Sequence, residues 1–283
     1  MTHTAHNVVM AGGPLKLGRD PLVMGILNVT PDSFSDGGDF SNRDLALNHA
    51  DALIAEGADI VDLGGESTRP GSEEVGVQAE LDRVMPILDA LAARDFEAPI
   101  SIDTYKALVA DQAVQAGASL INDVRGLQRD PEIAAVAACH GTPVIAMHWD
   151  TERDSGLDLI DEMKRWLSRS IEIALNAGIA KDKIILDPGF GFAKSFAENY
   201  ELLNRLDELH ALGFPLLVGT SRKRMIGNLL DVPPRERVSG TIATSVLGYL
   251  KGGHIFRVHD VRANRDALRV AAAALYGPPQ QKG

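Results

Sequence analysis

Met-Gly-Ile-Leu-Asn-Val-Thr-Pro-Asp-Ser-Phe-Ser-Asp-Gly-Gly, residues 24–38, changes from a strand pattern to a loop pattern within a few positions. Residues 23–27 form an apolar run that favours a buried strand and stops at the polar Asn28. The ten residues that follow include Pro31, two aspartates, two serines and a glycine pair, which are typical of turns and irregular loops. The stretch therefore predicts a strand whose carboxyl end opens into a loop, and the oxygens of that loop suit a cation.

The same pattern recurs along the chain. Seven more short apolar runs end abruptly in polar or glycine-rich residues, at 60–63, 99–102, 120–121, 144–147, 184–186, 216–218 and 255–256. The runs do not alternate between apolar and polar residues, which favours parallel strands that are buried on both faces.

Helical patterns lie between these runs. Apolar residues recur at helical spacing in 77–88, 163–174 and 238–250, and further helices are predicted at 44–55, 106–116, 131–139, 196–212 and 262–275. Eight strands, each followed by a helix, within about 250 residues predict an α/β protein of the (β/α)8 TIM-barrel type. A doubly wound open sheet is the alternative. Eight repeats favour closure, and no Gly-x-Gly-x-x-Gly follows the first strand, as a dinucleotide fold requires.

Size and composition fit a single domain over residues 1–283. The chain is 45% hydrophobic, which is enough for one large core. Residues 8–17, with Gly12 and Gly13 inside them, predict a small hairpin that closes the barrel floor within an N-terminal extension at 1–20. Residues 277–283 are expected to form a disordered tail.

Other features bear on location. No apolar run approaches the length of a membrane span, and residues 1–7 lack the apolar core of a signal peptide. The one cysteine, Cys139, excludes an internal disulfide and favours the reducing cytoplasm. Cys139 lies among alanines in a predicted helix, so we expect it to be buried.

The charge pattern predicts a small anionic ligand. The net charge is −11, which disfavours nucleic acid as a partner. Five cationic residues nevertheless follow the second, seventh and eighth predicted strands: Arg69, Arg222, Lys223, Arg257 and His259. Together they predict an anion site at one end of the barrel, and the alternative interpretation is that they are scattered surface charge. A helix that begins near residue 261, beside Arg257 and His259, would suit phosphate or pyrophosphate. Asn28 and Asp36 are candidate Mg²⁺ ligands beside it.

Polar residues also end three central strands. Asp103, Asn122 and Asp187 would face the barrel mouth, where an unpaired carboxylate or amide costs stability. A ligand edge with adjacent N–H donors, such as a 2-amino-4-oxo pyrimidine, would satisfy them, and Lys223 would bond the ring's acceptors. For any one of these residues a capping or salt-bridged role is an equal alternative. The histidines show no zinc-site spacing.

These motifs resemble those of the dihydropteroate synthase family, in the same order and from about Leu22 to Leu275. The two most specific are residues 28–38 and Gly-Gly-Glu-Ser-Thr-Arg-Pro-Gly at 64–71. Shorter matches are Ser-Ile-Asp-Thr at 101–104, Ile-Asn-Asp at 121–123, Asp-Pro-Gly-Phe-Gly-Phe at 187–192, Thr-Ser-Arg-Lys at 220–223 and Arg-Val-His-Asp at 257–260.

The resemblance implies an enzyme of folate biosynthesis that joins 6-hydroxymethyl-7,8-dihydropterin diphosphate to p-aminobenzoate, needs Mg²⁺, is a sulfonamide target and forms a homodimer. It implies a pterin pocket of Asp103, Asn122, Met147, Asp187 and Lys223. It implies pyrophosphate contacts from Asn28, Arg69, Arg257 and His259, and Mg²⁺ at Asn28 and Asp36. The implied p-aminobenzoate site is Phe34, Thr68, Pro70, Phe192 and Ser221, and the implied catalytic residues are Asp36, Arg69, Asp103, Asp187 and Lys223.

The chain departs from the family pattern in two places. Trp149-Asp150-Thr151 stands where the family more often has a Met-Gln-Gly-like stretch, and Ala193 replaces a frequent glycine. Two alternative functions remain open. A methyltetrahydrofolate-dependent methyltransferase uses a related barrel but would not need the first two loops, and a catalytically silent pterin-binding paralogue would keep the fold without the reaction.

Overall fold

The computed structural model describes residues 3–10, 12–30, 39–67, 73–94, 96–154 and 156–278, with the side chains of 39–41 left out. Within these ranges no helix is both long and apolar enough to cross a membrane. Part of the tail expected at 277–283 lies outside the description.

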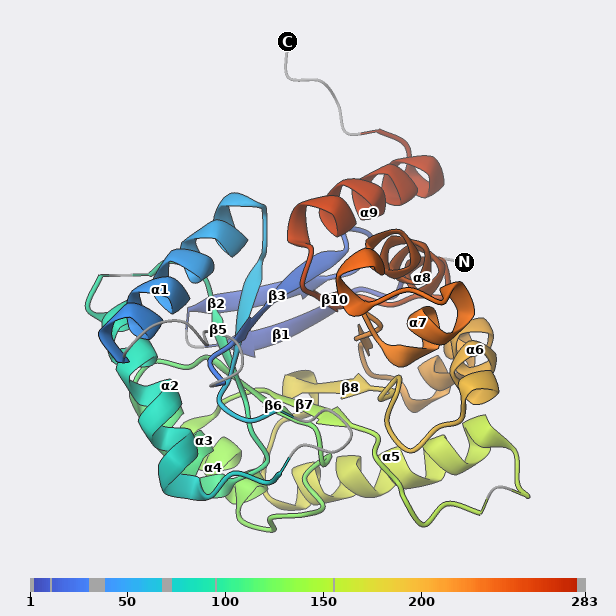
Figure 1. The fold of residues 1–283 in the computed structure, drawn as a ribbon. Coiled ribbons are helices and arrows are strands. Elements are labelled where there is room, and N and C mark those ends of the chain that lie inside the picture. The colour runs from blue at the N-terminus through green and yellow to red at the C-terminus, as the bar shows by residue number, and fades with distance from the viewer. Residues whose placement is uncertain are drawn as a thin grey trace.

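Eight parallel strands form the predicted barrel (Figure 1). Their order is β8-β7-β6-β5-β4-β3-β10-β9, and a parallel bridge between Leu186 and Leu216 links the two ends of the sheet. The strands are β3 (Leu22–Asn28), β4 (Ile60–Gly64), β5 (Ile100–Asp103), β6 (Leu120–Asp123), β7 (Val144–Met147), β8 (Ile184–Asp187), β9 (Leu217–Val218) and β10 (Ile255–Val258). Several strands extend to the polar residue that was expected to follow them. The backbone of these residues is therefore fixed by strand pairing, and their side chains start from a rigid position.

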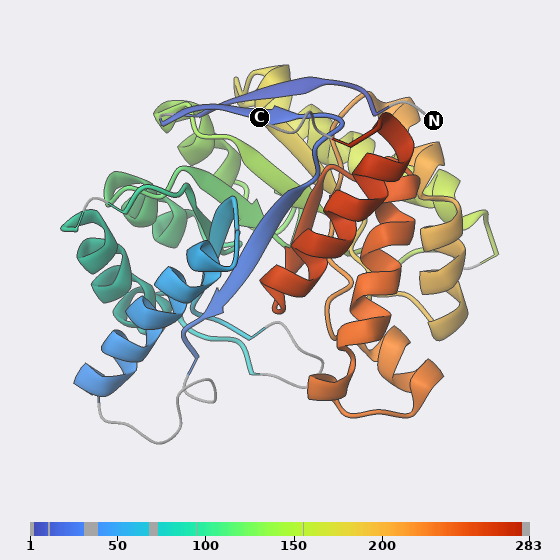
Figure 2. The ribbon, with the colours of Figure 1, turned by 90° about the horizontal axis from the view of Figure 1, so that it is seen from above.

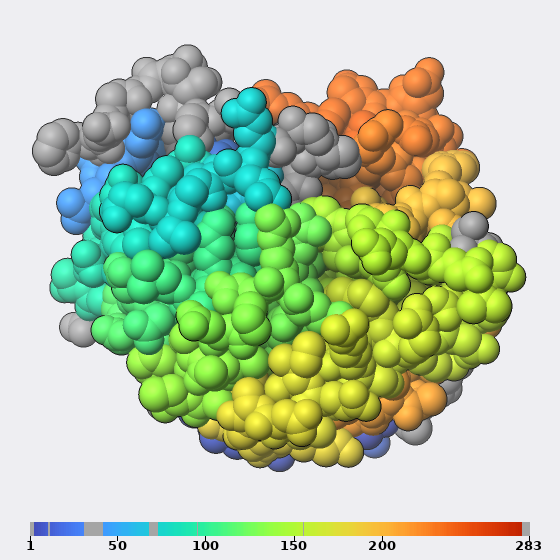
Figure 3. All heavy atoms as spheres, turned by 90° about the horizontal axis from the view of Figure 1, so that it is seen from below, coloured from blue at the N-terminus to red at the C-terminus, as the bar shows by residue number. Residues whose placement is uncertain are grey.

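Helices surround the sheet, and Figure 3 shows the side of the molecule that α2 to α5 cover. The helices are α1 (Asp39–Ala55), α2 (Val77–Ala92), α3 (Ala107–Gln115), α4 (Ile133–His140), α5 (Leu159–Asn176), α6 (Phe196–Asn204), α7 (Arg224–Leu230), α8 (Val238–Leu250) and α9 (Val261–Tyr276). Short 3₁₀ helices add η2 (Lys181–Lys183), η3 (Leu206–Leu212) and η4 (Pro234–Glu236).

The helix expected at 196–212 is two elements. It ends at Asn204, and η3 follows as a 3₁₀ helix. Leu206 and Leu209 are both buried, and a spacing of three residues places side chains on one face of a 3₁₀ helix. The short helix α7 was not predicted.

A hairpin closes the barrel floor, as the sequence predicts. Strands β1 (His6–Met10) and β2 (Gly13–Leu17) pair antiparallel, and Gly13 has the left-handed φ of 115° that the turn requires. The buried hairpin side chains pack on residues near the start of the barrel strands, among them Met24, Leu120 and Ile255. Figure 2 shows the hairpin across one end of the barrel. The opposite end, where the strands finish, is the end left for a site.

Cys139 is exposed, so the expectation that it is buried was wrong. Helix α4 buries Ile133, Ala134 and Ala137. Cys139 follows Ala137 by two positions, which places it on the other side of a helix with 3.6 residues per turn.

The apolar stripe of α8 is only partly buried, because Val246 packs against the barrel core while Leu250 is exposed. The helix buries Thr241, Thr244, Ser245, Gly248 and Tyr249. Small residues allow a close approach, since a Cβ on Gly248 would lie 3.1 Å from Val218 Cγ1. The buried hydroxyls are bonded: Thr244 Oγ1 lies 2.8 Å from Thr220 Oγ1 and Ser245 Oγ 2.8 Å from Asn264 Oδ1. The leucines of the helix are left on the outside.

Candidate active site

An ion-pair network lies where the barrel strands end. Arg257, from β10, donates through Nε to Asp62 Oδ2 at 2.6 Å and through Nη2 to Asp103 Oδ2 at 2.7 Å. Asn122, from β6, donates through Nδ2 to the same Asp62 oxygen at 3.2 Å. Strands β4, β5 and β6 are neighbours, and β10 pairs with β3 on the other side. The predicted residues Asp103, Asn122 and Arg257 are therefore brought together.

Asp62 is a member of this network that the sequence analysis missed. It is fully buried and connects Arg257 to Asn122. Its position could have identified it. Asp62 lies inside the apolar run 60–63, and a carboxylate in a buried strand must have a buried partner. The Oδ1 atom of Asn122 remains buried without a partner within the described ranges. It is an acceptor that a ligand N–H would satisfy.

Asp187 and Lys223 form the second part of the site. Asp187 Oδ1 accepts from the Gly189 N–H at 2.7 Å, and the Lys223 ammonium donates to the Phe190 carbonyl. A Cβ placed on Gly219 would lie 3.8 Å from Asp187 Oδ2 and 3.9 Å from Lys223 Nζ, so both charged groups border the same small space. Gly189 has a φ of 69°, and a Cβ there would lie 2.0 Å from the His148 carbonyl oxygen, so only glycine fits this turn.

Burial sets the electrostatics of these groups. It raises the pKa of Asp103 and of Asp187, although Arg257 opposes the rise for Asp103 and Lys223 opposes it for Asp187. Burial also lowers the pKa of Lys223 to about 8, although Asp187 works against that change. Buried carboxylates and an ammonium with few water contacts bind a ligand's donors and acceptors strongly, because the low dielectric strengthens each hydrogen bond.

Met147 and Phe192 lie in an apolar cluster at the same end of the barrel. Met147 is buried with Tyr105 and Val124, and Phe192 and Trp149 pack against them. A flat ring held by the polar strand ends would meet this apolar cluster with its face. Met147 and Phe192, which were predicted to contact the two substrates, therefore both lie beside the polar network.

Residues on the predicted anion side are also brought together. Ser221 Oγ lies 3.0 Å from His259 Nδ1 and accepts from the His259 backbone N–H at 3.1 Å. Arg222 forms an ion pair with Asp260. Helix α9 begins at Val261, as the sequence predicted, so the first turn of a helix follows His259 directly.

Asn28 lies at the end of β3, next to Gly64 of β4. A Cβ on Gly64 would be 3.4 Å from both Asn28 Oδ1 and Asp103 Cβ, so the amide oxygen faces the mouth beside the polar network. In the described part of the chain, no three histidine, cysteine or acidic side chains form a cluster suited to a metal. Five predicted site residues lie outside the described residues: Phe34, Asp36, Thr68, Arg69 and Pro70.

Comparison with known proteins decides the family. Residues 24–259 match the pterin-binding enzyme family. The dihydropteroate synthase of Bacillus subtilis is 53% identical over 241 residues, which cover 85% of this chain and 84% of the relative. The enzyme of Escherichia coli K12 is 49% identical over 261 residues, with 90% and 92% covered. The chain belongs to the dihydropteroate synthases.

Solved dihydropteroate synthases share the fold. A Xanthomonas albilineans structure with 4-aminobenzoic acid has a TM-score of 0.90 and 45% identity, covering 97% of this chain and 100% of that one. A Yersinia pestis structure with a sulfonamide drug complex has a TM-score of 0.87 and 47% identity, covering 95% and 98%. This synthase therefore has the barrel of its relatives along nearly its whole length.

Proposed function

We propose that the chain condenses 6-hydroxymethyl-7,8-dihydropterin diphosphate with p-aminobenzoate, giving 7,8-dihydropteroate and pyrophosphate. The observation that carries this proposal is the convergence of Asp103, Asn122, Asp187, Lys223 and Arg257 at the mouth of the barrel, around Asn122 Oδ1, a buried acceptor with no partner among the described residues. Family membership supports the reaction, and the convergence of these polar groups supports their assignment to the pterin.

The pterin edge is assigned to the polar strand ends. Asp187 keeps one oxygen on the Gly189 N–H and offers the other to the adjacent amino and ring N–H groups of the pterin. Asn122 offers its unpaired Oδ1, and Lys223 bonds the ring's acceptors. Met147 packs on the ring face.

The diphosphate is assigned to Asn28, Arg69, Arg257 and His259, with Mg²⁺ held by Asn28 and Asp36. The Asn28 oxygen fits this ion, because Mg²⁺ prefers a few oxygen ligands besides water and substrate phosphate. A bound Mg²⁺ would neutralise charge on the leaving pyrophosphate. Arg257 enters this role already oriented by its two carboxylate partners.

The residues act by charge placement rather than as a nucleophile. The bond between the pterin methylene carbon and the diphosphate oxygen breaks, and its electron pair leaves with pyrophosphate. The positive charge spreads into the dihydropterin, where Asp103 and Asp187 stabilise it. The neutral amine of p-aminobenzoate then forms the C–N bond and loses its proton. Phe34, Thr68, Pro70, Phe192 and Ser221 are assigned to hold the arylamine.

The test is pyrophosphate release from the pterin diphosphate with and without p-aminobenzoate. We expect sustained release only when both substrates and Mg²⁺ are present. A chain that binds the pterin diphosphate and releases nothing is the silent paralogue. For the metal, Asp36→Ala should lower turnover strongly with little effect on the unfolding temperature, and full activity of this variant in EDTA would refute the assignment.

We also propose that the protein is cytoplasmic and that two copies of the chain form a homodimer. Helices α8 and α9 lie side by side (Figure 1) and expose Leu247 and Leu250 as well as Val270, which is 71% exposed. These exposed apolar side chains on neighbouring helices support the proposal of an interface there. Light scattering at micromolar concentration should give twice the chain mass. Leu250→Glu should halve that mass, whereas Leu108→Glu on the exposed side of α3 should not.

A further inference from the structure

A row of cations and aromatic rings lies along the rim of the barrel. Lys223 Nζ lies 4.5 Å from the centre of the Phe192 ring, and the Phe192 and Trp149 ring centres are 4.6 Å apart. The Arg125 guanidinium lies 3.5 Å from the centre of the Trp149 ring and 5.7 Å from that of Tyr105. We call these five residues the rim stack. They follow five consecutive strands, β9, β8, β7, β6 and β5, so the stack links five loops.

The loops that carry Trp149 and Phe192 are joined to each other. Lys194 donates to the carbonyls of Gly189 and Phe192 at 3.0 and 3.1 Å, and its Nζ lies 2.9 Å from His148 Nδ1. His148 follows β7 directly, and the other groups belong to the loop after β8. The two rings therefore face each other from loops that share a buried polar link.

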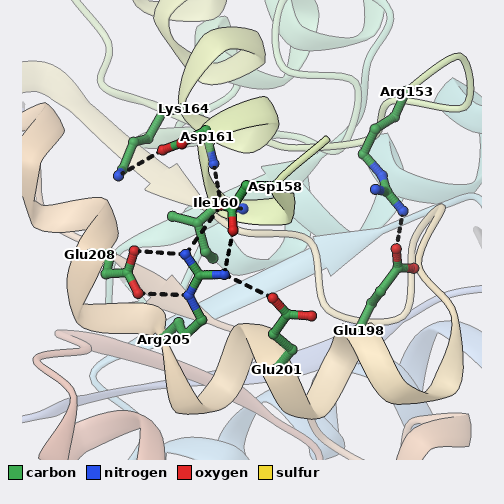
Figure 4. Close-up of polar contacts among 9 residues, drawn as sticks. All are labelled: Arg153, Asp158, Ile160, Asp161, Lys164, Glu198, Glu201, Arg205 and Glu208. Carbon is green, nitrogen blue, oxygen red and sulfur yellow. Dashed lines mark hydrogen bonds and ion pairs between the residues drawn. The ribbon is translucent and has the colours of Figure 1, made fainter. Parts of the chain in front are cut away.

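The far end of the Trp149 loop is fixed to helix α6 (Figure 4). Arg153 pairs with Glu198, whose carboxylate also caps the start of α6. Arg205, just after the same helix, bonds both oxygens of Asp158 at 2.7 and 3.1 Å. The loop between β7 and α5 is thus fixed at Arg153 and at Asp158, and His148, next to Trp149, is hydrogen-bonded to Lys194.

The Phe192 loop needs such support. Ala193 has a φ of 47°, in the left-handed region that costs a non-glycine residue conformational energy. The loop therefore does not favour this shape by itself. Lys194 and Asn199 hold its backbone by hydrogen bonds, and the Phe192 side chain is held by its own contacts, with Trp149 and with Lys223. The two rings are tilted by 51°, and an aromatic pair in contact with a cation beside it combines two attractive contacts.

We infer that Trp149 is a positioning residue that holds Phe192 in place and thereby sets the affinity for the arylamine substrate. This inference rests on the proposed function, which assigns Phe192 to the p-aminobenzoate site. Without Trp149, Phe192 would have to be ordered when the arylamine binds, and that ordering weakens binding. The pterin edge is assigned to Asp187, Asn122 and Lys223, of which only Lys223 belongs to the rim stack, so we expect pterin binding to depend less on Trp149.

The test compares Trp149→Leu with Trp149→Phe, which keeps an aromatic ring. In pyrophosphate-release kinetics, we expect Trp149→Leu to raise the KM for p-aminobenzoate about tenfold, with kcat and the KM for the pterin diphosphate changed less than threefold. Trp149→Phe should restore most of the affinity, and Arg125→Leu should give a smaller rise of the same kind. Arg129→Leu is the matched control, since Arg129 stacks on Tyr105 and pairs with Glu74 without contacting Trp149.

An unchanged KM for p-aminobenzoate in Trp149→Leu overturns the inference, and so does an equal loss in Trp149→Leu and Trp149→Phe. If Trp149→Leu does not fold, a fluorescence measurement on a folded variant tests the same inference. The chain has two tryptophans, so Trp166→Phe makes fluorescence report on Trp149 alone. Its emission should change when p-aminobenzoate binds in the presence of pyrophosphate and Mg²⁺, and a constant emission at saturating p-aminobenzoate refutes the role. A wild-type chain that releases no pyrophosphate refutes the proposed function instead.

Discussion

At the scale of one residue, Asp187 shows how a buried carboxylate can select a ligand. Its Oδ1 atom is occupied by the Gly189 N–H, so Oδ2 is the oxygen left for the pterin. In Asp187→Asn, the oxygen would stay with Gly189 and the amide NH₂ would face both the pterin donors and Lys223. We predict that pterin affinity falls at least about a hundredfold, because hydrogen bonds to a charged group contribute about 1.5–3 kcal/mol each.

Calorimetry with a pterin ligand measures this loss. Asp123→Asn is the matched control, because Asp123 is an equally buried strand-end carboxylate whose oxygens accept from the backbone N–H groups of Arg125 and Leu127. It should lower stability and leave pterin affinity nearly unchanged. Equal affinities in Asp187→Asn and the wild type would rule out the assigned pocket.

Asp62 acts through Arg257 and Asn122. Asp62→Asn removes the charge that holds Arg257 Nε at 2.6 Å and offers one acceptor where two donors now converge. We predict a rise of about tenfold in the KM for the pterin diphosphate and a loss of about 1–3 kcal/mol in the free energy of unfolding. Urea unfolding and steady-state kinetics measure the two effects. Asp161→Asn, at an exposed position, should change neither, and an Asp62→Asn enzyme with wild-type KM would refute the role.

At the scale of elements, a histidine cluster fastens the N-terminal hairpin to the barrel floor. His254 is fully buried, accepts from the Leu216 N–H at 3.2 Å and lies 3.1 Å from the Thr4 carbonyl oxygen. The rings of His3, His6 and His210 lie within about 6 Å of it. The pKa of His254 is lowered to about 4, mainly by burial and in smaller part by the neighbouring histidines.

This cluster predicts acid sensitivity. The unfolded chain takes up a proton at His254 near pH 6.5, whereas the folded chain takes it up only near pH 4. The contribution of neutral His254 to stability is therefore complete above pH 6.5 and is lost as the pH falls toward 4, by at most about 1.4 kcal/mol per pH unit. The fall in unfolding temperature between pH 7.5 and pH 5 should be several degrees smaller in His254→Gln than in the wild type. His49→Gln, at an exposed position, should keep the full pH dependence.

Elements were predictable wherever one pattern dominated. Strands β3 to β10 are apolar runs that end in polar residues, and the sequence shows both features directly. Helix α8 was harder, because its buried side is made of small and hydroxyl residues whose fit depends on Val218, Thr220 and Asn264 from other elements. The same limit applies to the site. Asp103 and Asp187 could be predicted because they end apolar runs. Asp62, the partner of Arg257 on β4, could not, because their contact depends on which strands are neighbours in the barrel.

At the scale of the whole molecule, the two ends of the barrel differ. The hairpin and the first residues of the strands form an apolar floor at one end, and the charged groups of the candidate active site lie at the other end. Charge is neutralised there within the chain: Arg257 bonds two carboxylates, and Lys223 is stabilised by Asp187. A substrate that brings its own anionic diphosphate and ring donors enters a site whose groups are already oriented. The loops after β3 and β4 carry the remaining assigned residues.

Those two loops lead to a prediction about the order of binding. Phe34, Thr68 and Pro70, which are assigned to p-aminobenzoate, lie outside the described residues on glycine-rich segments that contain Gly37, Gly38, Gly64, Gly65 and Gly71. Fixing a glycine costs more conformational entropy than fixing any other residue. Asp36 and Arg69 belong to the same segments and are assigned to Mg²⁺ and the diphosphate, so binding of those groups would offset the entropy before the arylamine arrives.

We therefore predict that p-aminobenzoate binds only after the pterin diphosphate, or after pyrophosphate with Mg²⁺. Calorimetric titration of p-aminobenzoate into the free protein should show little heat, and titration into protein saturated with pyrophosphate and Mg²⁺ should show saturable binding. Arg69→Leu should weaken the second titration, because the diphosphate would then order the loop less well. Equal affinity in the two wild-type titrations would mean that the arylamine site exists before the anion binds, and the coupling through loop ordering would be wrong.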